Sequence, residues 1–283
     1  MATVLVAVLL VLVVCRFVPD LAHLRIFSWW RVWLDRLGSK SAESALAIGV
    51  GAPVLLCVLL QWVLHGRLFG LSAFVFAVAM LFYCWGPRDL ERDVEAVEKA
   101  PDSERRTAAA QALRPDGQSA ALPFESEALV AATFDAALKR WFGVLFWFAV
   151  LGPAGALLYR LVQMLACMPE FAGERTTRAA AVLDWLPAHL MALALALASN
   201  FDAVFKTWRD WHAAQHGYFD LDPGFLDAIA RASVDADVAA GDGYAQDVHS
   251  PLVALDDALV LVRRILVVWL TVIALIVLAG WFG

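Results

Sequence analysis

The sequence has few charged residues and no excess of positive charge. Asp, Glu, Lys and Arg make up 18% of the chain, and the net charge is -6. No basic patch interleaved with aromatic residues occurs, so we expect no nucleic-acid partner. The four cysteines lack the C-x-x-C spacing of a metal or redox site, and we interpret them as small apolar residues of helices.

Familiar patterns for catalysis and metal binding are also absent. There is no G-x-x-x-x-G-K-[ST] phosphate loop and no G-x-S-x-G nucleophile elbow. His212 and His216 are four residues apart, but zinc needs a third and a fourth ligand, and none is evident. The acidic stretch from Asp235 has Ala240 where a calcium loop requires Gly and Gln246 where it requires Glu. The sequence therefore predicts no metal site and no catalytic residue of these classes.

Apolar residues, in contrast, are abundant. They form 61% of the chain, twelve residues are Trp, and the mean hydropathy is +0.68, as in integral membrane proteins. No stretch alternates as a strand would, so we expect an all-α, polytopic membrane helical bundle. Each span needs about 20 apolar residues, which allows about four to six transmembrane helices. The clear segments are 46–64, 68–85, 142–165 and 265–282, and two shorter ones are 3–14 and 183–199.

The positions of Lys and Arg predict the topology, because cytoplasmic loops hold the excess of these residues. On this basis residues 1–283 form a single integral-membrane domain, with a cytoplasmic helical loop at 86–141 and a second cytoplasmic segment at 200–264. The segment SWWRVWLDRL mixes Trp with Arg, which is typical of an amphipathic interfacial helix, and Gly38 ends it. Ser250 followed by Pro251 predicts the start of the last helix.

Ionisable and polar residues within apolar helices are functional candidates, because burying them in a bilayer is costly. Tyr159, Arg160 and Gln163 lie toward the end of segment 142–165. Asp184 and His189 lie in the next apolar segment. An ion pair of Asp184 with Arg160, or a contact of Asp184 with His189, would offset the free-energy cost of burying these side chains. Such a pair could line a ligand pocket or only hold two helices together, and the sequence leaves both open.

The segment 142–165 also contains helix-breaking residues. Gly152, Pro153 and Gly155 occur together in its middle. We interpret them as a kink or a close helix contact and not as a cradle for a ligand.

The order of the segments carries a family resemblance. An acidic amphipathic helix precedes GVLFWFAVLGPAGALLYRLVQML, and then come VLDWLPAHLMALALAL and the polar NFDAVFKTWRDW. This order resembles the AmpE family, inner-membrane proteins linked to regulation of β-lactamase induction. The resemblance implies a multi-pass protein of the bacterial inner membrane that signals in the response to antibiotics and cell-wall perturbation. It implies no cofactor. Beyond the lipid bilayer, the partners expected are a protein bound by the cytoplasmic loops and a cell-wall-derived or nucleotide-linked small molecule.

The AmpE family is itself similar to the CobD/CbiB membrane proteins of cobalamin biosynthesis, which are associated with ATP-dependent amide formation between a corrinoid carboxylate and an amino alcohol. Those enzymes have an acid-rich helix whose positions here read Ala131, Asp135, Ala136, Lys139 and Arg140. Activating a carboxylate with ATP requires acids that hold magnesium and donors that hold phosphate. The missing acids favour a non-catalytic regulator, and the alternative is an amide-forming ligase that uses ATP and magnesium. In either case the expected ligand pocket consists of Asp135, Tyr159, Arg160, Gln163, Asp184 and His189.

Overall fold

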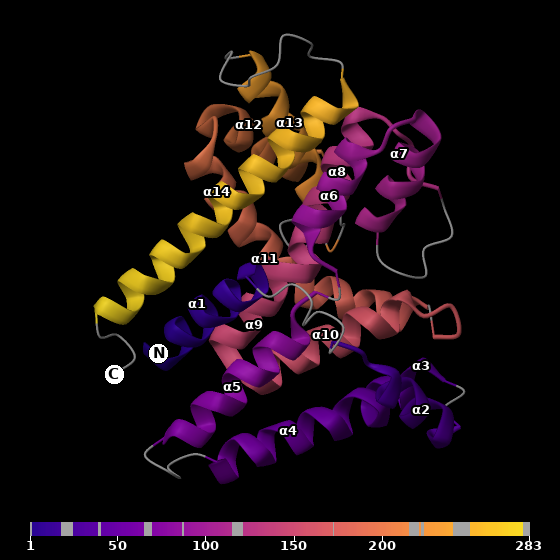
Figure 1. The fold of residues 1–283 in the computed structure, drawn as a ribbon, viewed down its shortest axis with the longest axis vertical. Helices are drawn as coiled ribbons and strands as arrows, with labels where there is room; N and C mark the ends of the chain where they lie inside the picture. Colours follow the sequence, from indigo (N-terminus) through magenta and orange to yellow (C-terminus); the bar gives the residue numbers. More distant parts are fainter. Residues whose placement is uncertain are drawn as a thin grey trace. The chain divides into compact units, whose positions relative to one another are not determined.

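The computed structural model contains only helices in the part of the chain that it describes (Figure 1). This part comprises residues 2–17, 25–38, 41–64, 70–86, 88–114, 121–171, 173–214, 221, 224–239 and 250–279. Within it, three helices are long and apolar enough to cross a membrane: Ala45–Leu64, Glu174–Ala198 and Pro251–Leu278. Leu5–Cys15 and Leu71–Cys84 are shorter apolar helices. The prediction of an all-α membrane bundle is confirmed.

The described chain divides into two compact units. Unit 1 comprises Met1–Pro87, Lys139–Leu183 and Ile273–Gly283, and unit 2 comprises Arg88–Leu138 and Asp184–Val272. Most of the two segments predicted to be cytoplasmic, 86–141 and 200–264, falls in unit 2. The side of the membrane on which each segment lies stays a prediction.

Unit 1 is built around the helix α10. Its helices are α1 (Ala2–Phe17), α2 (Ser28–Leu37), α3 (Ala42–Ser44), α4 (Gly51–Leu64), α5 (Leu71–Cys84), α9 (Gly143–Leu151), α10 (Pro153–Cys167) and the first part of α11 (Glu174–Ala198). A π-helical stretch, Ala45–Val50, leads into α4. The helix α10 packs against α4, α5 and α9, and most of its side chains are buried. It therefore forms the core of this unit.

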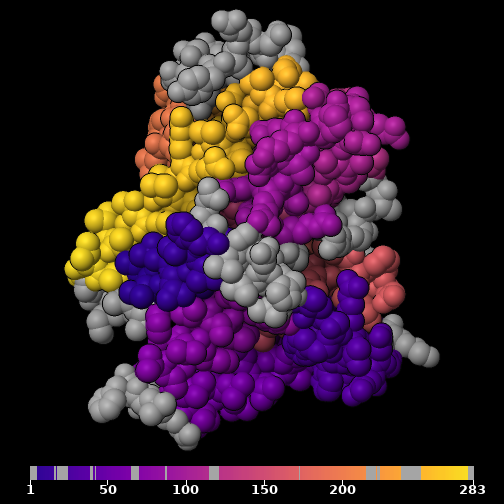
Figure 2. All heavy atoms as spheres, viewed as in Figure 1, coloured from indigo at the N-terminus to yellow at the C-terminus, as the bar shows by residue number. Residues whose placement is uncertain are grey.

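The outer side of α4 is apolar. Leu55, Leu56 and Leu59 are exposed, and Trp62 is 76% exposed. Side chains from this part of the chain lie at the molecular surface in the space-filling view (Figure 2). A row of exposed leucines is unfavourable in water and is what a helix facing lipid requires. This surface agrees with a lipid bilayer as the surroundings of α4.

The helix α2 has the bounds predicted from the sequence, Ser28–Leu37. Gly38 ends it in the left-handed conformation with φ 56°, and its N–H donates to the carbonyl of Asp35. One face is buried in unit 1, because the indole N–H of Trp30 donates to the Gly49 carbonyl at 2.8 Å. Trp30 therefore packs within the protein.

The single span predicted at 142–165 is wrong, because the chain breaks at Gly152. This residue has φ +71° and separates α9 from α10. Residues eight positions apart in a straight helix are separated by about 12 Å. Here a Cβ at Gly155 would overlap the carbonyl oxygen of Trp147, so the chain bends sharply and the two helices touch. The prediction of a kink with close helix packing at these glycines is confirmed.

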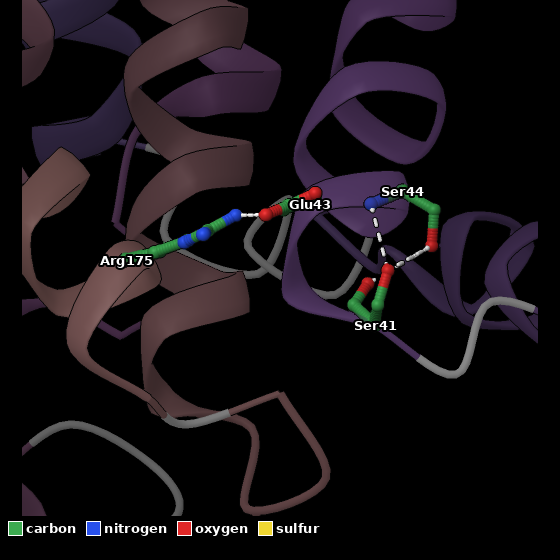
Figure 3. Close-up of polar contacts among 4 residues, drawn as sticks. All are labelled: Ser41, Glu43, Ser44 and Arg175. Atoms are coloured by element: carbon green, nitrogen blue, oxygen red, sulfur yellow. Dashed lines mark hydrogen bonds and ion pairs between the residues drawn. The ribbon is translucent and has the colours of Figure 1, made fainter.

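The start of α3 is joined to α11 at the surface of unit 1 (Figure 3). Glu43 forms an ion pair with Arg175, and the Ser41 hydroxyl accepts a hydrogen bond from the Ser44 N–H at 3.2 Å. Both charged side chains are more than 60% exposed. Exposed ion pairs contribute about 0–1 kcal/mol, so this contact orients the segment more than it stabilises it.

Unit 2 consists of amphipathic helices, three of which have a side-chain cap at the N-terminus. They are α6 (Leu90–Lys99), α7 (Ser103–Ala110), α8 (Ser126–Ala137), α12 (Phe201–Ala213), α13 (Gly224–Ala239) and parts of α11 and α14 (Pro251–Leu278). The Asp102 carboxylate accepts from the Arg105 N–H at 2.8 Å and so caps α7. The apolar face of α6 is buried, and α13 packs against α8 and α12. The last helix begins at Pro251.

Candidate functional site

The six residues predicted to form a pocket are divided between the two units. Unit 1 contains three of them on α10, namely Tyr159, Arg160 and Gln163. Unit 2 contains the other three on α8 and α11, namely Asp135, Asp184 and His189. One cavity shared by all six, and an ion pair of Asp184 with Arg160, therefore stay predictions.

The three residues of α10 lie in the core of unit 1. Tyr159 is fully buried, and Arg160 and Gln163 are each 5% exposed. The Tyr159 ring occupies the space beside Gly143, where an added Cβ would overlap the phenol. Tyr159 and Gln163 are one turn apart and share a helix face. A ligand pocket at these three residues stays a prediction.

Arg160 reaches the end of α5. Its Nε donates to the carbonyl of Cys84 at 2.9 Å. Its Nη2 is buried and has no hydrogen-bond partner among the described residues. A guanidinium N–H that is buried without an acceptor is costly.

Two further arginines meet the same stretch of backbone. Arg25 donates from Nη1 to the carbonyl of Gly86 at 2.9 Å and from Nη2 to the Cys15 sulfur at 3.0 Å. The Nε of Arg25 is buried and has no partner in the described part of the chain. The side chain of Arg140 covers Gly86 so closely that an added Cβ would lie 2.7 Å from its Cβ. Gly86 therefore allows this close approach.

We name Arg25, Arg140 and Arg160 the arginine cluster. Each is at most 7% exposed, and all three contact the backbone of residues 84–86 at the C-terminal end of α5. The charges of Arg140 and Arg25 act unfavourably on that of Arg160. The carbonyl end of α5 offsets part of this repulsion, because a helix C-terminus acts as about half a negative charge.

The sequence analysis identified Arg160 but missed its two neighbours. Their contacts join residues that are distant in the chain, with separations of 61 residues for Arg25 to Gly86 and 76 for Arg160 to Cys84. No local pattern indicates such a contact.

In unit 2, His189 lies in an aromatic cluster. Its ring stacks on Phe225 at 4.5 Å and lies edge-on to Trp208 at 5.4 Å. Its Nδ1 is 2.7 Å from the carbonyl oxygen of Trp185. A carbonyl only accepts, so Nδ1 carries the hydrogen and Nε2 has the lone pair. The Nδ1 partner of His189 is thus the backbone of its own helix and not the Asp184 carboxylate.

The described residues contain no group of three or more His, Cys, Asp or Glu side chains that could hold a metal ion. The ring centroids of His189 and His212 are 6.1 Å apart, but no third ligand joins them in this part of the chain. His216, the predicted neighbour of His212, lies outside the described residues. Asp135 is half-buried on α8. A shallow hollow beside α8 is lined by residues that include Glu127 and Arg231 and does not include Asp135.

Comparisons with known proteins identify the family. The profile of the family described as "CobD/Cbib protein" matches residues 4–230. The chain is 28% identical over 224 residues to "Cobalamin biosynthesis protein CobD" of Chromobacterium violaceum, covering 75% of this chain and 68% of that protein. No solved structure matches.

These matches correct the function predicted from the sequence. The AmpE-like regulator of β-lactamase induction is wrong, because the family profile and the curated relative both indicate the family that had been the alternative. Acids that are missing at a few positions of one helix do not outweigh a family match over most of the chain. With a match over most of its length and several apolar helices, the chain belongs to the CobD/CbiB family of multi-pass membrane proteins.

Proposed function

We propose that the protein is an ATP-dependent amide-forming synthase of the bacterial inner membrane that joins a corrinoid carboxylate to an amino alcohol. The observation that carries this proposal is the family match over residues 4–230. The relative from Chromobacterium violaceum, named for cobalamin biosynthesis, supports it. The partners of such an enzyme are the lipid bilayer and a nucleotide-linked small molecule.

The carboxylate must be activated before the amine can displace one of its oxygens. Without activation that oxygen would have to leave as hydroxide or oxide, and both are poor leaving groups. ATP transfers a phosphoryl group to the carboxylate oxygen and releases ADP, or it transfers an adenylyl group and releases pyrophosphate. The amine nitrogen then attacks the carbonyl carbon, a proton leaves the nitrogen, and the oxygen departs with phosphate or AMP. Charge develops on oxyanions in both steps, so buried cationic donors would stabilise them. Arg160 on α10 is such a donor.

A resident magnesium site does not fit the described residues. No group of three or more possible ligands exists among them, and Ala131, Ala136 and Lys139 stand where the family resemblance leads us to expect polar or acidic residues. Magnesium commonly binds proteins through one or two carboxylates together with substrate phosphates. In this proposal magnesium enters with the nucleotide, as part of the substrate.

The test is synthesis by the purified full-length chain in detergent or nanodiscs. The protein is incubated with a corrinoid that has a free carboxylate, an amino alcohol and magnesium ATP, and the corrinoid is analysed by mass spectrometry. We expect a product whose mass is the sum of corrinoid and amino alcohol less one water, with ATP hydrolysed in proportion. Reactions without ATP, or without the amino alcohol, are the controls.

A negative result has a clear meaning if the protein is intact. A monodisperse, helical preparation that forms no ATP-dependent product with any of a panel of amino alcohols would refute the proposal. Restoration of cobalamin-dependent growth in a strain that lacks its own CobD is the matching test in cells.

A further inference from the structure

We infer that the end of α11 and the whole of α12 form a hairpin that lies along the membrane, with one apolar face inserted into a single lipid leaflet. The partner of this face is the acyl-chain region of the bilayer. The face consists of five exposed side chains of unit 2: Leu186, Leu193 and Leu197 on α11, and Phe201 and Phe205 on α12. The inference goes beyond the proposed function, because it concerns how unit 2 meets the membrane and not the reaction.

The two helices fold back on each other. The side-chain oxygen of Asn200 accepts a hydrogen bond from the Ala203 N–H at 3.1 Å and so begins α12 directly after the turn. The ring of His189, ahead of the turn, lies 5.4 Å from the ring of Trp208 and 6.1 Å from that of His212, which both follow the turn. The last part of α11 and α12 therefore run antiparallel and in contact.

The exposed apolar side chains continue from one helix to the other. Leu186, Leu193 and Leu197 are spaced by seven and four positions, so they form one row on α11. Their exposed fractions are 40%, 52% and 72%. Phe201 and Phe205 are each more than half exposed, and their rings stack at 5.6 Å. In the antiparallel pair, Leu197 is level with Phe201 and Leu193 with Phe205.

The leucine row and the phenylalanine pair lie on the same side of the hairpin. A helix turns by about 100° per residue, so the leucine row is displaced by about 60° from His189. Phe205 is displaced by about 40° from the mean direction of Trp208 and His212, in the same rotational sense. In two antiparallel helices, displacements of the same sense from the line of contact point to the same side. The five side chains thus form one continuous apolar face.

Neither water nor the centre of the bilayer suits this hairpin. A row of exposed leucines and phenylalanines is unfavourable in water. The segment Glu174–Ala198 is apolar enough to cross a membrane, but α12 packs along its last part and would enter the hydrocarbon with it. The exposed surface of α12 includes Lys206 and Arg209, and Arg209 is 71% exposed. Charged side chains are costly at the bilayer centre.

A position at the membrane surface satisfies both requirements. Amphipathic helices in the interface bury their apolar face about 5–10 Å deep and keep their charged side chains among the headgroups. The exposed charges of α12 are two acids and two bases: Asp202, Asp210, Lys206 and Arg209. Because these charges balance, we expect the insertion to depend on the apolar face and not on the charge of the lipid headgroups.

The test measures which solvent each side chain meets. The full-length protein is placed in phosphatidylcholine nanodiscs and carries one nitroxide label, at Phe205→Cys or at Lys206→Cys as the matched control on the same helix. Cys15 and Cys167, which are half-buried, are replaced by alanine, and the buried Cys57 and Cys84 are kept. Collisions with oxygen, which dissolves in lipid, and with a water-soluble nickel chelate are measured by electron paramagnetic resonance. We expect the oxygen-to-nickel ratio to be several-fold higher at Phe205 than at Lys206, and unchanged by phosphatidylglycerol.

A depth measurement separates a surface hairpin from a crossing helix. Leu186 and Leu197 are eleven positions apart, or about 16 Å along a helix. Labels at Leu186→Cys and Leu197→Cys should therefore differ in depth by much less than about 16 Å if the hairpin lies along the membrane. A difference close to that value would mean that α11 crosses the bilayer, and it would overturn the inference.

Two other results would also overturn it. A label at Phe205 that meets nickel as readily as the label at Lys206 would place the face in water. A label at Phe205 that neither reagent reaches would assign the face to a protein contact, such as a second copy of the chain. Phe201→Cys repeats the measurement on the same face if Phe205→Cys folds poorly.

Discussion

The contact between Gly143 and Tyr159 predicts that Gly143→Ala destabilises the protein. Helix propensity alone predicts the opposite. In an exposed helix, Gly→Ala stabilises by about 1 kcal/mol. At Gly143 the new Cβ would overlap the buried phenol of Tyr159. Overpacking of a core typically costs about 1–3 kcal/mol, so the two effects leave Gly143→Ala destabilising by up to about 2 kcal/mol.

A second glycine supplies the matched control. Gly51 begins α4, and a Cβ there would have the Leu46 carbonyl oxygen at 4.0 Å as its nearest neighbour. Gly51→Ala should therefore stabilise, or change nothing. Unfolding of the purified protein in detergent, titrated with denaturant and followed by tryptophan fluorescence, measures both variants.

The clash has a specific partner, so a double variant tests its cause. Tyr159→Leu removes the ring that the new methyl group would meet. In the Tyr159→Leu background, Gly143→Ala should cost less than it does alone, because contacting residues are not additive. Equal costs in both backgrounds, or a stabilised Gly143→Ala variant, would show that the packing of α9 on α10 described above is wrong.

Three other outcomes follow from the described contacts. Gly152→Ala should destabilise by about 1–3 kcal/mol in the same assay, since φ is +71° and an added Cβ would lie 2.9 Å from the Gln61 side chain. Asp102→Ala removes the cap of α7 and should cost about 0.5–2 kcal/mol, whereas Asp102→Asn should cost less. Burial raises the pKa of the Glu98 carboxyl, and Asp256 and Glu95 raise it further. The ionised form is thus disfavoured in the folded state, so Glu98→Gln should stabilise the protein at neutral pH, and this gain should vanish as the pH falls through the pKa; a pH-independent gain would contradict it.

The local features of the fold could be predicted because they depend on neighbouring residues. The bounds of α2, the buried face of α6 and the start of α14 follow from Trp and Arg spacing, from apolar residues three and four apart, and from proline at a first turn. Each of these signals lies within about ten residues. The class of membrane protein followed from composition alone.

Function was harder to predict from individual residues. Missing acids near Asp135 suggested loss of chemistry and led to the wrong regulator, although the match across residues 4–230 indicates the biosynthetic family. A few positions say little about a site when the groups that could bind substrate come from elsewhere in the chain. Arg25, for example, donates to the carbonyl of Gly86, which lies 61 positions later in the chain.

The sequence by itself determined the helical membrane class, the bounds of α2, the start of α14 and the burial cost that marks Tyr159, Arg160 and Gln163 as candidates. Only the tertiary structure decided that the segment 142–165 breaks at Gly152 and that three arginines gather at the end of α5. Helix formation and apolar character are properties of short windows. Contacts between residues 61 and 76 positions apart depend on the packing of whole helices, which no short window contains.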